Sequence, residues 1–341
     1  MNRRDLLKNA GIGATFAAAT VVGSGSLIET AAAQTAAPSR KSGRKFKVID
    51  MRCRPPLPQY AGLYKMRREN LQMGGRPNTL ANPATMGDGP PLIAKDMAGK
   101  PGAMEEYWKE VDKAGIDIVA TNGRYAAGIP SMTMDNDGLL KLQKEYKGRF
   151  LGYAMLNTDI PMEETVADLE RALAGGLRGA ALEPGYRTKN GGATTIDNAD
   201  FYPIIETMIA ADLPLFTQTG PMAGVYDWHA TNELWRFDAL MNKFPRLKLV
   251  LVHGGYLNQT AALALATKHP NVVLMPDVYT FWPGGQIYQQ NLEILQDQFI
   301  YASAFPFADM DTSLKLTLEL PVSDEVMAKY LSGNVSRIMN L

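Results

Sequence analysis

The sequence contains few of the residues that form disulfides and metal sites. Cys53 is the single cysteine, so no disulfide can form within the chain, and stability must come from a hydrophobic core. There are three histidines, which limits the sites that could be built from several imidazoles. Lys and Arg together number 35, as do Asp and Glu. The chain therefore lacks the basic excess that binding to nucleic acid or to an anionic membrane requires.

Two common catalytic motifs are also missing. The glycines at Gly123 and at Gly191-Gly192 do not follow the pattern of a strand, a glycine-rich loop with its lysine, and a helix that cradles phosphates. No Gly-x-Ser-x-Gly elbow occurs, so a serine hydrolase is not indicated.

The first 34 residues have the pattern of an export signal. A basic start with Arg3-Arg4 precedes a short apolar run and the small residues Ala31-Ala32-Ala33. The paired arginines favour a twin-arginine signal, and an ordinary secretory signal is the alternative. The apolar run is too short to serve as a stable membrane anchor. We expect a periplasmic or secreted protein, with residues 35–45 as a linker before the folded domain.

Residues 46–341 alternate between short apolar runs and longer helical patterns. Alternation of this kind predicts βαβ units and a parallel sheet, and eight strands in about 300 residues favour a single (β/α)8 barrel of the TIM type. The clearest helical patterns cover residues 162–174, 202–211, 234–244 and 259–268. The eight predicted strands are residues 47–52, 117–121, 150–155, 179–183, 214–218, 248–253, 272–275 and 300–303.

The connection after the first strand is unusually long. Residues 53–100 are rich in Pro, Gly, Met and Asn and show no steady period. A loop of this length is usually functional, and after a barrel strand it belongs to the face where active sites form. We interpret it as a lid or a subunit-contact arm. A passive surface insertion is the alternative, because loops tolerate insertions at little cost.

Several strand ends resemble the amidohydrolase-related (amidohydrolase 2) family, which includes enzymes similar to aminocarboxymuconate semialdehyde decarboxylase. The resemblance spans residues 48–341 and implies the barrel predicted above. The matching segments are VID at 48–50, GLRGAAL at 176–182, LPLFTQTG at 213–220, LVLVHGG at 249–255, YASAFPF at 301–307 and LSGNVSR at 331–337.

The departures from the family pattern fall on its metal ligands. The family's first strand continues into His-x-His, and this chain has Arg52-Cys53-Arg54 instead. The family's next histidine is replaced by Gln218 and its final aspartate by Ala304, so only His253 remains at a family ligand position. Arginine is permanently charged and has no lone pair to offer a cation. We therefore expect no metal and no other cofactor.

The two arginines suggest an anion-binding site instead. Residues two apart on a strand face the same side, so Arg52 and Arg54 should point into the barrel mouth, with Cys53 turned toward the helices. Guanidinium groups bind carboxylates or phenolates and stabilise developing negative charge. We expect a small anionic or phenolic substrate. The alternative is that either arginine forms an ion pair with Asp50, Glu183 or Asp277.

Proton transfer needs a titratable group, and His253 is the best candidate because histidine titrates nearest neutral pH. Its alternative role is that of a buried imidazole retained from a metal-binding ancestor. Glu183 and Asp277 are further catalytic candidates at strand ends. His269 should lie at a helix end on the surface. The predicted substrate-binding residues, most of which have surface exposure or loop packing as the alternative, are Tyr186, Arg187, Gln218, Trp228, His229, Tyr279 and Ser303.

The leading functional hypothesis is a metal-independent enzyme that breaks a carbon–carbon bond in a small oxygenated aromatic compound. The resemblance favours a lyase, with Arg52 and Arg54 holding an oxyanion. A lactone or ester hydrolase and a non-catalytic binding protein are the alternatives. A metal enzyme with rearranged ligands, His253, His229, Glu183 and Asp277, is a further one. A homodimer is an open alternative on which the sequence gives no evidence.

Overall fold

The computed structural model describes residues 45–72, 82–126, 129–182, 195–220 and 233–341. The chain separates into two compact units, Met1–Pro38 and Ser39–Leu341, and every described residue belongs to the second. The predicted signal peptide and nearly all of the predicted linker lie outside the described residues. None of the described helices is long and apolar enough to cross a membrane.

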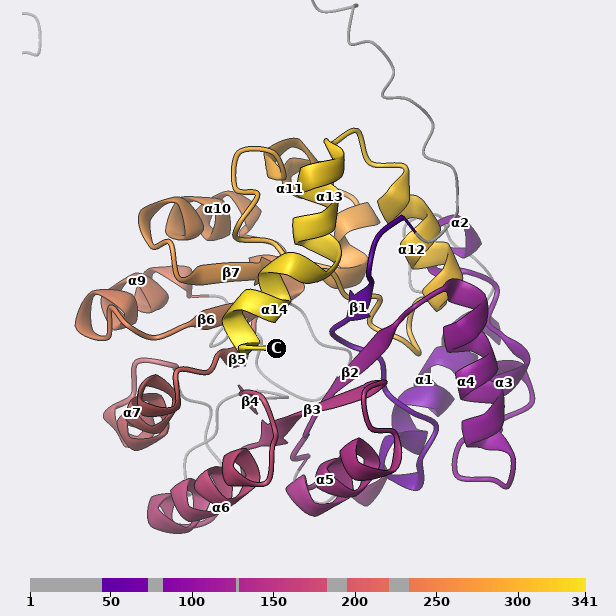
Figure 1. Cartoon of the computed structure of the whole chain (residues 1–341), viewed down its shortest axis with the longest axis horizontal. Coiled ribbons are helices and arrows are strands. Elements are labelled where there is room, and N and C mark those ends of the chain that lie inside the picture. Colours follow the sequence, from indigo (N-terminus) through magenta and orange to yellow (C-terminus); the bar gives the residue numbers. More distant parts are fainter. Residues whose placement is uncertain (1–44, 73–81, 127–128, 183–194, 221–232) are drawn as a thin grey trace, which may run out of the picture. The chain divides into compact units, whose positions relative to one another are not determined.

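A parallel sheet of seven strands in sequential order curls into the barrel (Figure 1). Sequential order is what repeated right-handed βα units produce. The strands are β1 (Ile49–Asp50), β2 (Ile118–Asn122), β3 (Phe150–Met155), β4 (Ala180–Leu182), β5 (Leu215–Gln218), β6 (Leu249–Val252) and β7 (Val272–Met275). Each lies within one of the predicted strands, except that β2 runs one residue further.

The predicted eighth strand closes the barrel without forming a regular ladder. The amide of Ile300 donates to the carbonyl of Leu274 on β7 at 3.0 Å, and the amide of Met51 donates to the carbonyl of Tyr301 at 3.2 Å. Residues 299–301 therefore bridge β7 and the chain just after β1. The prediction of a (β/α)8 barrel is confirmed.

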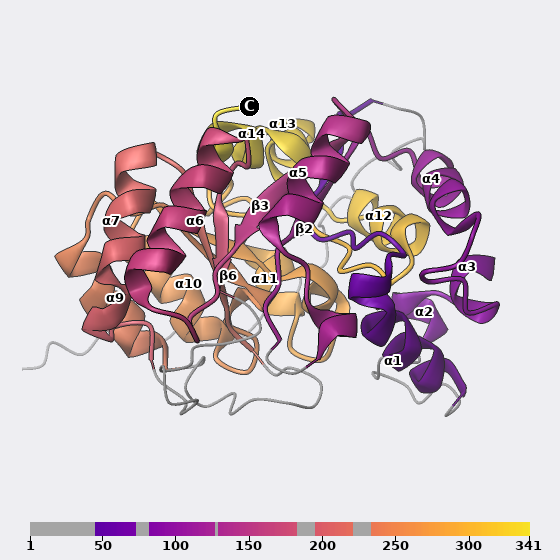
Figure 2. The same cartoon turned by 90° about the horizontal axis from the view of Figure 1, so that it is seen from below.

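Helices surround the sheet on its outer side (Figures 1 and 2). The four clearest helical patterns coincide with α6 (Met162–Ala174), α7 (Tyr202–Ala211), α9 (Leu234–Lys243) and α10 (Gln259–Lys268). The other helices of the repeat are α4 (Ala103–Ala114), α5 (Asn136–Glu145), α11 (Gln286–Asn291), α12 (Met310–Leu318), α13 (Asp324–Ala328) and α14 (Asn334–Met339). Shorter helical turns are η2 (Pro130–Met132), η3 (Ala199–Phe201), η4 (His253–Gly255), η5 (Asp277–Phe281) and the π-turn η6 (Lys329–Gly333).

The long connection after β1 is more ordered than its sequence indicated. It contains η1 (Pro58–Tyr60), α1 (Ala61–Gln72), α2 (Pro83–Met86) and α3 (Pro91–Ala94), which lie beside α4 and α12 (Figures 1 and 2). The prediction of a long connection after the first strand is confirmed, and its helices were not anticipated. Prolines at the first turns of α2 and α3 start helices of only four residues, too short to produce a visible period.

A buried arginine ties this insertion to the barrel. The Arg67 guanidinium, on α1, donates to the carbonyls of Met86 and Gly87 at 3.1 and 2.7 Å and lies 3.7 Å from the Asp309 carboxylate. Asp309 precedes α12, and its Oδ2 also accepts from the Gly89 amide at 2.9 Å. These contacts hold α1 and residues 86–89 of the insertion against Asp309, which lies between the closing segment of the barrel and α12.

The hydrophobic core has two layers. Alternate residues of the strands, among them Ile49, Phe216 and Val252, fill the barrel interior together with residues of α14. The opposite faces of the strands pack against the surrounding helices. This is the two-sided burial expected of parallel strands.

Candidate active site

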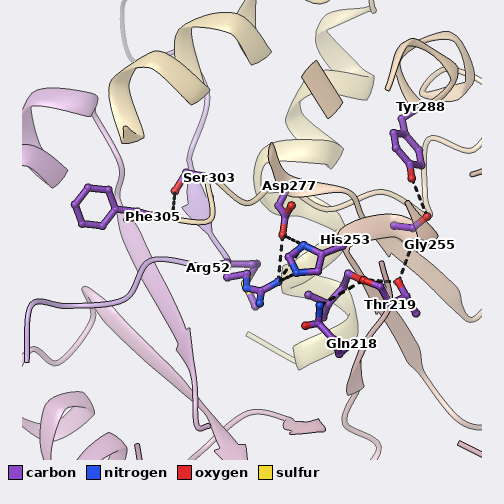
Figure 3. Close-up of polar contacts among 12 residues, drawn as sticks. Arg52, Gln218, Thr219, His253, Gly255, Asp277, Tyr288, Ser303 and Phe305 are labelled. Carbon is purple, nitrogen blue, oxygen red and sulfur yellow. Dashed lines mark hydrogen bonds and ion pairs between the residues drawn. The ribbon is translucent and has the colours of Figure 1, made fainter. Parts of the chain in front are cut away.

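Three charged or titratable side chains meet at the carboxyl ends of the strands. Arg52 Nη1 lies 3.0 Å from His253 Nε2 and 3.2 Å from Asp277 Oδ2, and His253 Nδ1 lies 2.7 Å from the same Asp277 oxygen (Figure 3). All three residues are buried. The sequence had named each of them as catalytic, and the structure brings them together.

Backbone turns, and not strand alternation, aim these side chains. Met51 and Val252 face the barrel interior, so regular alternation would send Arg52 and His253 toward the helices. The chain turns at residues 51–52, however, and His253 adopts a left-handed φ of 65° directly after β6. The side chains therefore reach each other because the strands end just before them.

Left-handed backbone recurs at three neighbouring strand ends. His253 follows β6, Asp277 lies two residues beyond β7 with φ of 46°, and Ala304 follows the closing segment with φ of 61°. A non-glycine residue in this region is strained, and such residues concentrate at functional sites. The geometry singles out the rim of the barrel around Arg52.

Arg54 is also buried beside this rim. Its amide donates to the carbonyl of Phe305 at 3.1 Å, and its own carbonyl accepts from the Tyr64 hydroxyl at 2.7 Å. Tyr64 belongs to α1, so the insertion helps fix the backbone of this arginine. Its charge acts on Cys53, where it lowers the pKa of the thiol in opposition to burial.

Asp50 and Ser303 shape the turn that follows β1. Asp50 Oδ1 accepts from the amides of Arg52 and Ser303 at 3.1 and 2.9 Å, while burial raises the pKa of its carboxyl. Ser303 Oγ accepts from the Phe305 amide at 3.1 Å (Figure 3). Ser303, predicted to bind substrate, is thus engaged in holding its own loop and has no contact with the Arg52 cluster among the contacts of the described residues.

Cys53 belongs to the core between sheet and helices, as the sequence predicted. Burial, followed by the nearby Asp50 charge, raises the pKa of its thiol well above the usual value. A thiol kept protonated is a poor nucleophile. Its Sγ lies 3.5 Å from Ser303 Oγ, and its carbonyl accepts from Thr121.

Gln218 ends β5 next to the His253 strand. It pairs in the ladder with Val252, the residue before His253, and only 1% of it is exposed. Its Nε2 is 3.4 Å from the carbonyl of Thr219, while its Oε1 has no hydrogen-bond partner in the described structure. The structure therefore places Gln218, which was predicted to bind substrate, beside the cluster with an acceptor available.

Aromatic rings cover one side of His253. The Tyr279 ring meets the imidazole edge-on, with 5.1 Å between the ring centroids. The same ring stacks on Tyr256 and packs against Trp282, with centroid distances of 4.2 and 5.0 Å. Burial, with a smaller contribution from Asp277, raises the pKa of Tyr279, so its hydroxyl remains protonated. Trp282 Nε1 reaches Met86 Sδ at 3.5 Å, so the insertion touches this aromatic group.

The remaining predicted residues lie away from the Arg52 cluster or outside the described residues. His269 follows the end of α10 and precedes β7, where its Nε2 lies 2.7 Å from Asp238, so it lies at a helix end as the sequence indicated. Five predicted site residues lie outside the described residues: Glu183, Tyr186, Arg187, Trp228 and His229.

Arg124 is a site candidate that the sequence analysis did not name. It lies two residues beyond β2, is 2% exposed, and is fixed by a bridge in which its amide and carbonyl bond to Met134 at 3.0 and 2.8 Å. An arginine just after a barrel strand was the available signal. It adds a third buried guanidinium to the strand ends of β1 and β2, beside Arg52 and Arg54.

Among the described residues of this rim, two side chains that could ligate a transition-metal ion lie in contact, His253 and Asp277. Ligand atoms must converge to about 2.0–2.3 Å from such an ion. Across the described ranges, no group of three or more His, Cys, Asp and Glu side chains converges. His253 and Asp277 do lie in contact with each other, but both also contact Arg52 Nη1. The fixed positive charge of that guanidinium would repel a metal cation bound by the pair.

Comparisons with known proteins agree with the fold. An uncharacterized TIM-barrel protein from Bordetella bronchiseptica has 23% identity and a TM-score of 0.73, covering 86% of this chain and 99% of that one. A manganese-bound 5-carboxyvanillate decarboxylase from Novosphingobium aromaticivorans has 15% identity and a TM-score of 0.61, covering 87% and 97%. The 4-oxalomesaconate hydratase of Rhodopseudomonas palustris has 18% identity and a TM-score of 0.55, covering 86% and 95%.

Sequence comparison places the chain in a family. No curated protein gives a significant match. The family model Amidohydro_2, described as Amidohydrolase, matches residues 49–341, which is nearly the whole of the barrel unit. The chain belongs to the amidohydrolase family.

Proposed function

We propose that this chain is an exported, metal-independent enzyme that breaks a carbon–carbon bond in a small oxygenated aromatic acid. One observation carries the proposal: a guanidinium nitrogen of Arg52 lies in contact with both His253 and Asp277. This contact supports metal independence, because a metal ion bound by those two side chains would lie close to a cation that the chain itself provides. The decarboxylases among the solved structures that this chain resembles support the choice of reaction class.

The described residues divide into three roles. Arg52 and Arg54 bind the anionic oxygens of the substrate and stabilise negative charge on them. Asp277 accepts from His253 Nδ1 and holds the imidazole in one orientation. His253 is the proton carrier, since histidine exchanges protons near neutral pH.

The chemical step follows from these roles. Protonated His253 delivers its proton to the ring carbon that bears the carboxylate, while the ionised phenolic oxygen of the substrate supplies electrons as it becomes a carbonyl. The bond to the carboxylate then breaks, its electron pair restores the ring and the phenolate, and carbon dioxide leaves. Water returns a proton to His253, so one proton is consumed for each carbon dioxide released. No metal or organic cofactor enters this balance.

A non-catalytic binding protein is the second candidate, and one contact favours it. Arg52 Nη1 lies within 3.3 Å of both ring nitrogens of His253, and Asp277 also contacts Nδ1. An imidazole engaged in this way must part from Arg52 before its Nε2 can exchange a proton with a ligand.

Two measurements test the proposal together. Elemental analysis of protein purified without chelators should find fewer than about 0.1 metal ions per chain, because a working metal site fills nearly stoichiometrically. Incubation with a panel of hydroxylated aromatic acids should release carbon dioxide. About one metal per chain would refute metal independence, and tight binding of the acids without turnover would favour the binding protein.

Variants then test the roles. Replacement of Arg52 by Gln should lower turnover at least about 100-fold, since one preorganised charge contact to a developing oxyanion is worth that much. Arg149→Gln is the matched control, because Arg149 is half-exposed and pairs with Asp112 on the outer surface. Turnover near the wild-type rate in Arg52→Gln, with thermal unfolding showing a folded protein, would refute the oxyanion role.

Export is the part of the proposal that rests on sequence alone. The basic start with Arg3-Arg4, the apolar run and the Ala31-Ala32-Ala33 segment support it. Its test is given with the predictions for the whole molecule.

A further inference from the structure

Gln218 is held at a fixed place between two strands of the barrel. It is the last residue of β5, and its side chain lies on the same face as Phe216, which fills the barrel interior. The ladder places it directly beside Val252, and β6 ends there with His253 as the next residue. Its amide therefore lies at the interior rim, next to the strand that carries His253 (Figure 3).

The surroundings of Thr219 decide which end of the Gln218 amide is available. Thr219 donates from its amide and its hydroxyl to the carbonyl of Val252 at 3.0 and 2.5 Å, and its hydroxyl accepts from the Gly255 amide at 2.8 Å. The carbonyl of Thr219 is thereby fixed, and it faces Gln218 Nε2 at 3.4 Å. Turning the amide over would set Oε1 against another acceptor. The available group is therefore the acceptor, Oε1.

That oxygen has no protein donor in the described structure, although Gln218 is 99% buried. Buried polar atoms without a partner are uncommon, because each loses its hydrogen bonds to water. The neighbouring groups are a guanidinium and an imidazole, which bind anionic oxygens. A carboxylate or a phenolate brings no donor for Oε1, whereas a hydroxyl group does.

We infer that Gln218 determines specificity by accepting a hydrogen bond from a hydroxyl group of the ligand. The inference rests on the proposed function, because it assumes a small anionic aromatic ligand at the Arg52 cluster. Gln218 thereby distinguishes a hydroxylated aromatic acid from the same acid without its hydroxyl. A site built to bond a hydroxyl rejects the analogue that lacks it more strongly than an apolar site does.

The experiment is calorimetric titration of the full chain with benzoate and with each of the three monohydroxybenzoates. The measured quantity is the ratio of the dissociation constant of benzoate to that of the tightest hydroxybenzoate. We expect a ratio of about 10 in the wild type, typical of one net hydrogen bond to a buried group. In Gln218→Met, which keeps the length and removes the acceptor, the ratio should fall to about 1.

Two further variants complete the test. Gln218→Glu retains an acceptor and should preserve the preference for the hydroxyl, with weaker binding of every anion by charge repulsion. Gln143→Met is the matched control, because Gln143 is a well-paired glutamine that bonds the Gly176 carbonyl and the Gly152 amide at 2.8 and 2.9 Å on α5. It should leave the ratio unchanged.

Each outcome separates this inference from the proposed function. A wild-type ratio near 1, or a ratio that Gln218→Met leaves unchanged, overturns the role of Gln218 even if the acids are turned over. A ratio near 10 that is lost in Gln218→Met, without any turnover, supports the inference and overturns the enzyme proposal. If none of the four acids binds, both fall.

Discussion

Asp277 uses one carboxylate oxygen for two partners. Its Oδ2 lies 2.7 Å from His253 Nδ1 and 3.2 Å from Arg52 Nη1, and the residue is 3% exposed. A buried charge pair contributes little net stability compared with apolar replacements, but removal of one partner leaves the other charge buried and uncompensated. The pair can therefore be measured apart from any catalytic assay.

The first prediction concerns this pair. Asp277→Asn and Arg52→Met should each lower the free energy of unfolding by about 3 kcal/mol, and the double variant should cost less than the sum by at least about 1 kcal/mol. Urea unfolding of the four proteins measures the coupling. Additive effects, within about 0.5 kcal/mol, would show that the two side chains do not interact in solution.

The second prediction concerns the strained rim. Ala304 has a φ of 61°, a region that glycine enters without strain. Ala304→Gly should therefore raise the free energy of unfolding by about 0.5–1 kcal/mol, despite the greater entropy of glycine in the unfolded chain. Ala120→Gly, in the regular strand β2, is the control and should lower it. A loss of stability in Ala304→Gly would mean that the left-handed conformation is not strained.

At the residue scale the sequence predicted which side chains meet but not why. Arg52 and His253 were named because they end predicted strands, and Asp277 because it follows one, and the three side chains lie in contact. The alternation argument that aimed Arg52 inward does not apply, because β1 ends at Asp50. Turns with φ above zero at non-glycine residues have no sequence signature, so Asp277 and His253 could be named but not oriented. The hydrogen bond by which Ser303 holds its own loop could not be predicted either, because it depends on the same kind of turn.

At the element scale, strongly periodic helices were predictable and short ones were not. The patterns at 162–174, 202–211 and 259–268 match α6, α7 and α10 residue for residue. In the insertion, α2 and α3 have four residues each, which is about one turn and cannot show a period. Their place is fixed by Arg67 and Asp309, two residues more than 200 positions apart. A contact of that range leaves no mark in a local pattern.

The third prediction belongs to this contact between insertion and barrel. Burial raises the pKa of Asp309 to about 6, with the Arg67 charge and the Gly89 amide opposing the shift. The folded protein therefore holds this proton more tightly than the unfolded chain does. The resulting stabilisation is complete below the ordinary aspartate pKa near 4 and is lost as the pH rises through about 6.

Asp309→Asn removes this proton uptake and keeps an acceptor for the Gly89 amide. Relative to the variant, the wild type should lose up to about 3 kcal/mol of unfolding free energy between pH 4 and pH 6.5. Denaturant unfolding at several pH values measures the difference, and exposed Asp200→Asn serves as the control. Parallel curves for the wild type and Asp309→Asn would show that Asp309 has an ordinary pKa.

At the scale of the barrel unit, closure of the barrel depends on residues 299–301, which bridge β7 and the chain after β1 without regular strand pairing. Asn334, at the start of α14, donates from Nδ2 to the carbonyls of Gln296 and Phe299 at 2.7 and 2.8 Å, and it is 2% exposed. These bonds hold the closing segment against the final helix. Composition and periodicity predicted that the barrel would close, whereas the irregular pairing at residues 299–301 follows from such side-chain contacts and could not be predicted.

The fourth prediction tests this closure. Asn334→Ala should lower the free energy of unfolding by about 2 kcal/mol, because the buried carbonyl of Phe299 and the partly buried carbonyl of Gln296 lose their donor. Asn242→Ala, whose weak bond to Asp238 is on the surface, should have little effect. Equal stability of the two variants in urea would show that Asn334 is not needed to hold the last barrel position.

The fifth prediction concerns the segment before the barrel. Replacement of Arg3 and Arg4 by lysine should leave the full-length chain in the cytoplasm, because the twin-arginine route reads that pair. Cell fractionation and immunoblotting measure the distribution, with Lys8→Arg as a control that keeps the charge. Unchanged export of the variant would favour the ordinary secretory signal instead.

The Arg52 cluster also limits how this chain could change over evolutionary time. Substitution of Ala304 by Asp or of Gln218 by His would move the sequence toward the family pattern by one ligand. With Arg52 in place, the new aspartate would gain a guanidinium partner and the new imidazole a cationic neighbour, so neither step would gain an ion. Under the proposed metal-independent function, coordination at this rim would first require a substitution of Arg52, which would leave Asp277 with His253 as its partner but without its guanidinium. Under the same proposal, this one arginine therefore limits what substitutions at the family's other ligand positions can achieve.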